Sequence, residues 1–119
     1  MSEELGFASI RDLSARLRRR ELSAEELVTA LIERTQRADR HLNSYITFLP
    51  EQALAQARAA DDAIRRRATL GLLHGIPVSI KDHIATAGVR TTAGAKAMLD
   101  RVPEKDAGWR AGSRMQAPS

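Results

Sequence analysis

Apolar side chains recur at helical spacing through the first half of the chain, and this pattern predicts a series of amphipathic helices. The first stripe, with arginine and serine between its members, consists of Ile10, Leu13 and Leu17. Ser23 and Glu26 then have the spacing of a capping box, in which a hydroxyl and a carboxylate satisfy backbone N–H groups at a helix start. We expect a second helix to begin there and to run to about His41.

The pattern changes after Asn43-Ser44, which ends the second helix. Tyr45–Phe48 has the composition of a short strand, and Pro50 is placed to open a third helix. The stripe of this third helix consists of Ala53, Ala57, Ala60 and Ile64. Because its buried face is mostly alanine, we expect the helix to pack closely against a larger element, and the sequence offers no evident partner for it.

An apolar run, Leu72–Ile80, ends directly on Lys81. The β-branched residues from Ile76 onward predict a short buried strand, with Pro77 at its start or edge because proline cannot donate to a ladder. Side chains alternate along a strand, so Lys81 would share a face with Ser79 and not with the aliphatic residues. The pattern therefore places a lysine where water should be scarce.

Such a lysine has two interpretations. Withdrawal from water makes an ammonium group give up its proton more readily, so Lys81 would become able to accept a proton from a hydroxyl near neutral pH. The alternative is that Lys81 ends the strand and extends into solvent, which is the commoner fate of a lysine. Asp82, His74 and His83 lie nearby in the sequence, but their spacing does not match a metal site. We expect neither a metal nor a cofactor.

Composition sets the bounds of the fold. With 119 residues the chain is one domain at most, and an aromatic content of 3% leaves a core of aliphatic and alanine side chains. The chain has no cysteine, which excludes disulfides and thiolate metal sites. The acidic N-terminus, Met1–Glu4, is followed by no apolar stretch of signal-peptide or membrane-spanning length. We therefore expect a cytoplasmic protein with no membrane partner.

Arginine carries most of the net charge of +4, since only three of the 19 basic residues are lysine. The arginines gather between positions 16 and 20 and between positions 65 and 67, each time at the expected end of a helix. Cations there complement the helix dipole, and this is the interpretation we favour. The alternative is a non-enzymatic helical module that binds a partner such as nucleic acid through these arginines.

Leu73–Asp82, followed by Thr91–Gly94, resembles the front end of the amidase signature family. Upstream, Leu22–Val28, Asn43–Tyr45 and the alanine-rich helix resemble that family's opening helices in order and spacing. The resemblance covers residues 9–107 approximately. It implies hydrolysis or transfer of carbon–nitrogen amide bonds in a small-molecule amide substrate.

The resemblance also implies a catalytic triad in which a serine nucleophile is relayed through a second serine, held in a cis peptide, to a buried lysine. Lys81 matches that lysine. In the family both serines and a glycine-rich oxyanion loop lie downstream, where this chain has only Gly112-Ser113-Arg114. Two of the three triad members are missing, so we expect the chain to be inactive alone.

The expected fold class is α/β: N-terminal helices plus the first strands of an amidase-signature mixed sheet, truncated. Residues 1–107 would form the N-terminal part of an amidase domain, and residues 108–119 a divergent tail. The codons of that tail can be read in a shifted frame that starts at the third base of each codon, with bases that the amino acid does not determine chosen as G or C. The peptide encoded in that frame resembles the helix with which the family continues. We hypothesise a frameshift there, and the alternative is an unrelated disordered tail. Without the rest of the sheet, we expect marginal stability.

Three functions remain open. The leading one is a truncated amidase-type hydrolase that carries only the catalytic lysine of a Ser-cisSer-Lys triad. The second is part of the A subunit of an aminoacyl-tRNA amidotransferase, which the same front end resembles and which would add tRNA and partner subunits. The third is the arginine-rich binding module. Nothing before Lys81 separates the first two, because downstream loops select the substrate.

Overall fold

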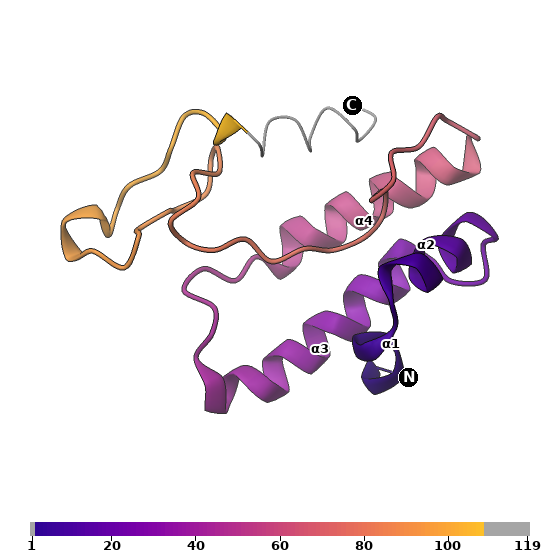
Figure 1. Cartoon of the computed structure of the whole chain (residues 1–119), viewed down its shortest axis with the longest axis horizontal. Helices are drawn as coiled ribbons and strands as arrows, with labels where there is room; N and C mark the ends of the chain where they lie inside the picture. Colours follow the sequence, from indigo (N-terminus) through magenta and orange to yellow (C-terminus); the bar gives the residue numbers. More distant parts are fainter. Residues whose placement is uncertain (1, 109–119) are drawn as a thin grey trace. The chain divides into compact units, whose positions relative to one another are not determined.

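The computed structural model describes residues 2–108 (Figure 1). In chain order its elements are α1 (Ser2–Phe7), α2 (Ile10–Arg18), α3 (Ala24–Leu42), α4 (Pro50–Arg65) and the 3-10 helix η1 (Lys96–Met98). The chain divides after Pro77 into two compact units, and each is described by itself below. All four α-helices belong to the first unit, and η1 belongs to the second.

Side chains at the helix starts explain where α2 and α3 begin. The Ser9 hydroxyl accepts a hydrogen bond from the backbone N–H of Asp12 at 3.1 Å and caps α2. At α3 the predicted capping box is present: Ser23 Oγ accepts from the Glu26 N–H at 3.0 Å, and Glu26 Oε2 accepts from the Ser23 N–H at 2.8 Å. Together with α4, which begins at the predicted Pro50, these helices confirm the three that the hydrophobic pattern predicts.

A second cap for α3 comes from α4, far along the sequence. The carboxylate of Asp61 accepts hydrogen bonds from the backbone N–H groups of Ala24, at 2.7 Å, and Glu25, at 3.1 Å. The first-turn donors that a helix leaves without internal partners are thus satisfied by Ser23 on one side and Asp61 on the other. This arrangement fixes the start of α3 against the C-terminal part of α4.

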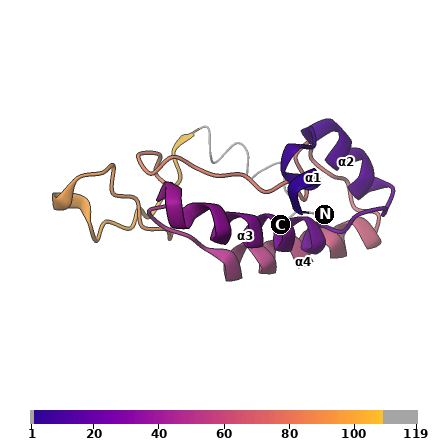
Figure 2. The same cartoon turned by 90° about the horizontal axis from the view of Figure 1, so that it is seen from below.

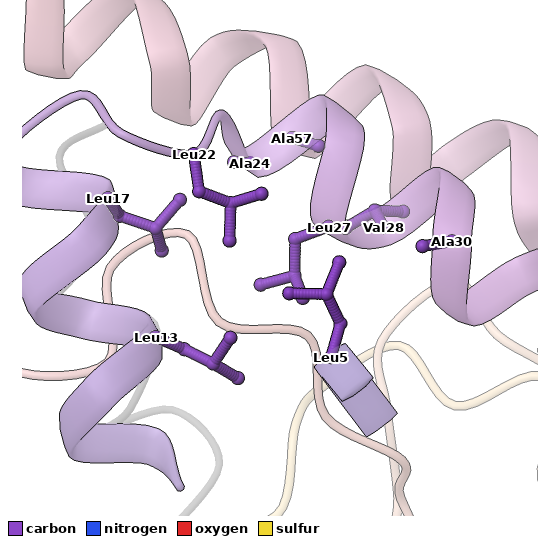
Figure 3. Packing of buried hydrophobic residues seen from close by; sticks show 9 residues of the cluster. All are labelled: Leu5, Leu13, Leu17, Leu22, Ala24, Leu27, Val28, Ala30 and Ala57. Carbon is purple, nitrogen blue, oxygen red and sulfur yellow. The ribbon is translucent and has the colours of Figure 1, made fainter. Parts of the chain in front are cut away.

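The core of the first unit lies around α3. Helices α3 and α4 run antiparallel and side by side, and α1 also packs against α3 (Figure 2). Figure 3 shows how the apolar side chains gather between these helices and α2. The cluster consists of Leu5, Leu13, Leu17, Leu22, Ala24, Leu27, Val28, Ala30 and Ala57. Leu17 and Leu27 are the largest side chains that are fully buried.

The alanine face of α4 has its partner within this unit. Ala57 is buried in the cluster, and Ala53 and Ala60 pack against it from the same helix. The expectation that the sequence offers no partner for this face is therefore wrong, because α3 supplies the surface. Alanine allows the two helices to approach closely, as the pattern predicted.

Helix α1 was not predicted by the pattern. It has six residues, of which Leu5 is buried in the cluster, and Phe7 lies beneath the guanidinium of Arg34 on α3, with 4.6 Å between Arg34 Cζ and the ring centroid. A helix this short depends on such tertiary contacts, because its own hydrogen bonds barely offset the cost of nucleation. Periodicity over six residues carries too little signal to reveal it.

Residues 2–108 contain no β-strand. Tyr45–Phe48, expected as a short strand, is a loop with bends at Ile46 and Thr47, so that expectation is wrong. The segment 76–81, expected as the first strand of a mixed sheet, is an irregular chain in this structure. A strand needs a ladder partner, and the α/β fold with 76–81 as a first strand of a mixed sheet stays a prediction. Within residues 2–108, no helix has both the length and the apolar character needed to cross a bilayer.

Candidate active site

Lys81, the predicted catalytic residue, lies at the beginning of the second unit. Its side chain is exposed, and Ser79 beside it is exposed as well. Val78, expected on the buried face of the strand, is 59% exposed. The described residues therefore do not supply the dry environment in which a lysine becomes a base, and such an environment would have to come from other residues.

Asp82, the next residue, is tied to a distant loop. Its Oδ1 accepts a hydrogen bond from the Thr92 N–H at 3.1 Å, and its Oδ2 accepts from the Thr92 hydroxyl. Its backbone carbonyl accepts from the Ala93 N–H at 3.0 Å. We call these three residues, Asp82, Thr92 and Ala93, the clamp. The clamp joins the two sequence segments on which the family resemblance rests, Leu73–Asp82 and Thr91–Gly94.

The distant loop is itself a tight turn. The Ala95 N–H donates to the Thr92 carbonyl at 3.0 Å, and the two residues between them, Ala93 and Gly94, have φ of 53° and 72°. Positive φ at both central positions defines a type I′ turn. The Thr92 hydroxyl also accepts from the Gly94 N–H at 3.1 Å, so it holds the turn on one side and Asp82 on the other. Alanine in this conformation is strained, as only glycine adopts it freely.

The clamp favours an ionised carboxylate. Hydrogen bonds to Asp82, first of all from the Thr92 hydroxyl, lower the pKa of that carboxyl below its usual value. Desolvation acts in the opposite direction, and the positive charge of Arg90 adds to the lowering. Asp82 is therefore a negative charge next to the lysine in sequence, with both of its oxygens accepting hydrogen bonds from Thr92.

Further hydrogen bonds bring the end of the described chain back to this loop. The Thr91 N–H donates to the Arg101 carbonyl at 3.0 Å, and the Ala87 N–H donates to Asp106 Oδ1 at 2.7 Å. The buried side chains here are the threonines, Thr86, Thr91 and Thr92. The hydroxyls of the first two donate to the carbonyls two residues earlier in the chain. The second unit is thus held together mainly by backbone and threonine hydrogen bonds.

The two histidines near Lys81 in sequence do not converge with it on a site. His74 lies in the first unit, where its Nε2–H donates to the Ala60 carbonyl at 2.9 Å. Gly75 follows with φ of 75°, and a Cβ there would lie 3.3 Å from Leu17 Cδ1, so this position requires glycine. His83 is exposed in the second unit. Across residues 2–108, no three His, Cys, Asp or Glu side chains form a group able to hold a metal ion.

Arginines near the end of α2 donate hydrogen bonds to the end of α4 and to the loop that follows it. Arg20 Nη2 donates to the carbonyls of Ile64 and Arg65 at 3.4 Å, and Arg18 Nη2 donates to the Gly71 carbonyl at 3.0 Å. Terminal carbonyls of a helix lack internal donors, and Arg20 supplies a donor to those of α4, whereas Arg18 binds the loop that follows α4. The contacts agree with the helix-end interpretation, and they connect the end of α2 to the end of α4.

The predicted tail, residues 108–119, lies outside the described residues apart from Gly108, and so does Gly112-Ser113-Arg114. The structure therefore describes one of the proposed triad members, Lys81. The residues of the clamp are visible in the sequence, where an aspartate follows the candidate lysine and a threonine pair precedes Ala-Gly. Their contact is not, because a hydrogen bond across ten residues of loop leaves no periodic pattern.

Comparison with known proteins supplies the family. The family model described as Amidase matches residues 26–111, a range that includes Lys81 and the whole clamp. The chain belongs to the amidase family. The A subunit of glutamyl-tRNA(Gln) amidotransferase from Moorella thermoacetica is 43% identical over 104 residues, which cover 87% of this chain and 21% of that protein. The protein of the same name from Methylococcus capsulatus is 49% identical over 92 residues, which cover 77% of this chain and 19% of that protein.

A third relative, the protein of the same name from Geobacter metallireducens, is 43% identical over 103 residues, covering 87% of this chain and 21% of that protein. The chain thus spans about a fifth of the length of the curated relatives it matches. The resemblance inferred from the sequence motifs is confirmed at the level of the family.

Proposed function

We propose that this chain contributes the lysine of an amidase active site, and that Lys81 is the residue that accepts the proton from a serine hydroxyl. The observation that carries the proposal is the clamp, which joins Lys81-Asp82 to the Thr91–Gly94 turn inside the matched range. General-base catalysis requires a proton acceptor whose backbone is held in place, and this geometry holds it.

The chemistry is cleavage of a carbon–nitrogen amide bond. A serine would lose its proton to Lys81 through a second serine, attack the amide carbonyl and form an acyl-enzyme, while the amine or ammonia leaves with a proton. Both serines stand downstream in the family, so this chain supplies the base without a nucleophile. We propose that the isolated chain does not hydrolyse amides.

The exposed apolar side chains that precede Lys81 in the sequence support the proposed α/β fold. Leu72 is 79% exposed, Leu73 47% and Val78 59%. We propose that 76–81 becomes a strand of a mixed sheet when further strands are present to cover these side chains and pair with its backbone. The same covering would exclude water from Lys81.

The more specific candidate is part of the A subunit of a tRNA-dependent amidotransferase. Three relatives with that name share 43–49% of their matched residues with this chain. In this role the ammonia released from glutamine passes to a misacylated tRNA, and the partners are tRNA and the other subunits. The role implies the cytoplasmic location expected from the sequence.

A fusion tests the proposal. Residues 1–107 of this chain replace the corresponding first fifth of the Moorella thermoacetica relative, which supplies the rest of the amidase domain. We expect ammonia release from glutamine by this fusion protein, and a loss of about 10²–10⁴-fold in rate for Lys81→Met, the range of general-base catalysis. The matched control is Lys96→Met, because Lys96 is an exposed lysine of the same unit. Equal rates for the two variants would contradict the proposal.

The same fusion protein tests whether this segment is compatible with the transferase. Assembled with the partner subunits of the Moorella thermoacetica relative, the fusion protein should transfer the ammonia to misacylated tRNA. Failure of this transfer while ammonia release persists would count against the amidotransferase assignment. The 119-residue chain by itself should release none from glutamine or simple amides.

A further inference from the structure

We propose that Asp82 is a positioning residue for Lys81, and that it acts through Thr92. The inference deepens the proposed function and rests on it, because it assigns a role to a neighbour of the proposed base. Asp82 does not need to touch the substrate. Its role is to fix the backbone from which the Lys81 side chain extends.

The geometry restrains the chain at the Lys81 carbonyl and at the residue that follows it. After Lys81, Asp82 is held at three points, through its two carboxylate oxygens and its carbonyl. The Lys81 carbonyl itself accepts from the Ile84 N–H at 3.0 Å. The backbone at Lys81 is thus part of a turn whose next residue is tied to a loop ten positions away.

The Thr92 hydroxyl is the central group of this arrangement. Thr92 is 4% exposed, and its hydroxyl donates to Asp82 Oδ2 while accepting from the Gly94 N–H. Hydrogen bonds to an ionised carboxylate are shorter and stronger than neutral ones. A valine at this position would keep the shape of the side chain and lose both hydrogen bonds, whereas a serine would keep both.

Thr91 provides a matched control for a merely structural role. Thr91 is adjacent to Thr92 in the sequence and is 2% exposed. Its hydroxyl donates at 3.0 Å to the Val89 carbonyl and not to Asp82. If the threonine hydroxyls only stabilise the second unit, Thr91→Val and Thr92→Val should have similar consequences. If Thr92 positions Lys81 through Asp82, its replacement alone should lower the catalytic rate.

The experiment measures kcat and KM for glutamine in the fusion protein. We expect Thr92→Val and Asp82→Asn to lower kcat by about 10–100-fold with KM nearly unchanged, because a small misplacement of the base slows the chemical step more than binding. Thr92→Ser should restore kcat to within a few-fold of the parent value, and Thr91→Val should stay at the parent value. Equal kcat values for Thr92→Val and Thr91→Val would overturn the inference.

The outcome of Lys81→Met separates this inference from the proposed function. If Lys81→Met is inactive and Thr92→Val retains full kcat, the inference fails and the proposed function stands. If Lys81→Met retains activity, the proposed function fails and the inference fails with it.

A second measurement uses the 119-residue chain itself and needs no activity. Amide hydrogen exchange at Thr92 and Ala93 should accelerate at least tenfold in Asp82→Ala, while exchange in α3 is unchanged. Unchanged exchange at both amides would show that the clamp does not hold the loop, and would overturn the inference even if the fusion protein does not fold.

Discussion

The two units of this chain are stabilised in different ways. In the first unit the buried side chains are apolar and form the cluster around α3. In the second, the buried side chains among the described residues are three threonines, and hydrogen bonds between loops hold the backbone. The first unit therefore carries its own core, whereas the second keeps its polar contacts in place around an exposed lysine. The difference is consistent with the proposal that the segment around Lys81 needs further residues to cover it, whereas the helices cover one another.

The core of the first unit should be the most sensitive to mutation. Leu27 is fully buried at the centre of the cluster, so Leu27→Ala should cost about 2–5 kcal/mol of its free energy of unfolding. Urea denaturation followed by helical circular dichroism measures the loss. Leu72→Ala, at a leucine that is 79% exposed, is the control and should change stability by less than about 0.5 kcal/mol. Similar losses for both variants would contradict the assignment of the core.

The cap that α4 gives to α3 should have the next largest effect. Asp61→Ala removes the acceptor of two backbone N–H groups, and we expect a loss of about 1–2 kcal/mol. The neighbouring Asp62 pairs with Arg65 at the surface, where an ion pair contributes about 0–1 kcal/mol. Asp62→Ala should therefore be the milder variant in the same denaturation experiment. The opposite order would show that the Asp61 contacts do not stabilise the unit.

Acid should open the clamp in the second unit. The pKa of Asp82 is lower in the folded chain than in the unfolded chain, where it is about 3.9. The clamp is therefore fully present above the unfolded value and is lost as the pH falls through the folded value. The amide proton shift of Thr92, followed by NMR, should titrate with a midpoint below about 3.9. Asp82→Asn should abolish this titration. A midpoint at or above the ordinary value would contradict the hydrogen bonds to Asp82.

The smallest expected effect concerns the type I′ turn. Ala93 has φ of 53°, so Ala93→Gly removes strain and should stabilise the loop locally by about 0.5–1 kcal/mol. Ala95, with φ of −99°, is unstrained, and Ala95→Gly should weaken the same loop slightly. Hydrogen exchange at the Ala95 N–H in Ala93→Gly, and at the Ala93 N–H in Ala95→Gly, measures the two changes. Exchange that moves in the same direction in the two variants would contradict the assigned turn.

The contrast between the units also explains what the sequence predicted. Helices α2, α3 and α4 follow from local signals, namely apolar spacing, the Ser23 capping box and Pro50 at a helix start. The packing of the Ala57 face on α3 and the cap from Asp61 depend on which helices meet, and no local signal contains that information. Helix α1 is too short to have a usable period.

For the candidate site, the sequence proposed Lys81 and contained both motifs, but it did not reveal the connection between them. That connection is a long-range hydrogen bond between Asp82 and Thr92, which depends on loop conformation and not on periodicity. The predicted strand at 76–81 depends on ladder partners, and Lys81 depends on side chains that would cover it.

The most direct test of the account is the rate of ammonia release from glutamine by the Lys81→Met fusion protein, divided by the rate of the Lys96→Met fusion protein. The account predicts a ratio of about 10⁻² to 10⁻⁴, because the proton acceptor is lost in one variant and an exposed lysine in the other. A ratio near one, with both fusion proteins active, would show that Lys81 is not the base.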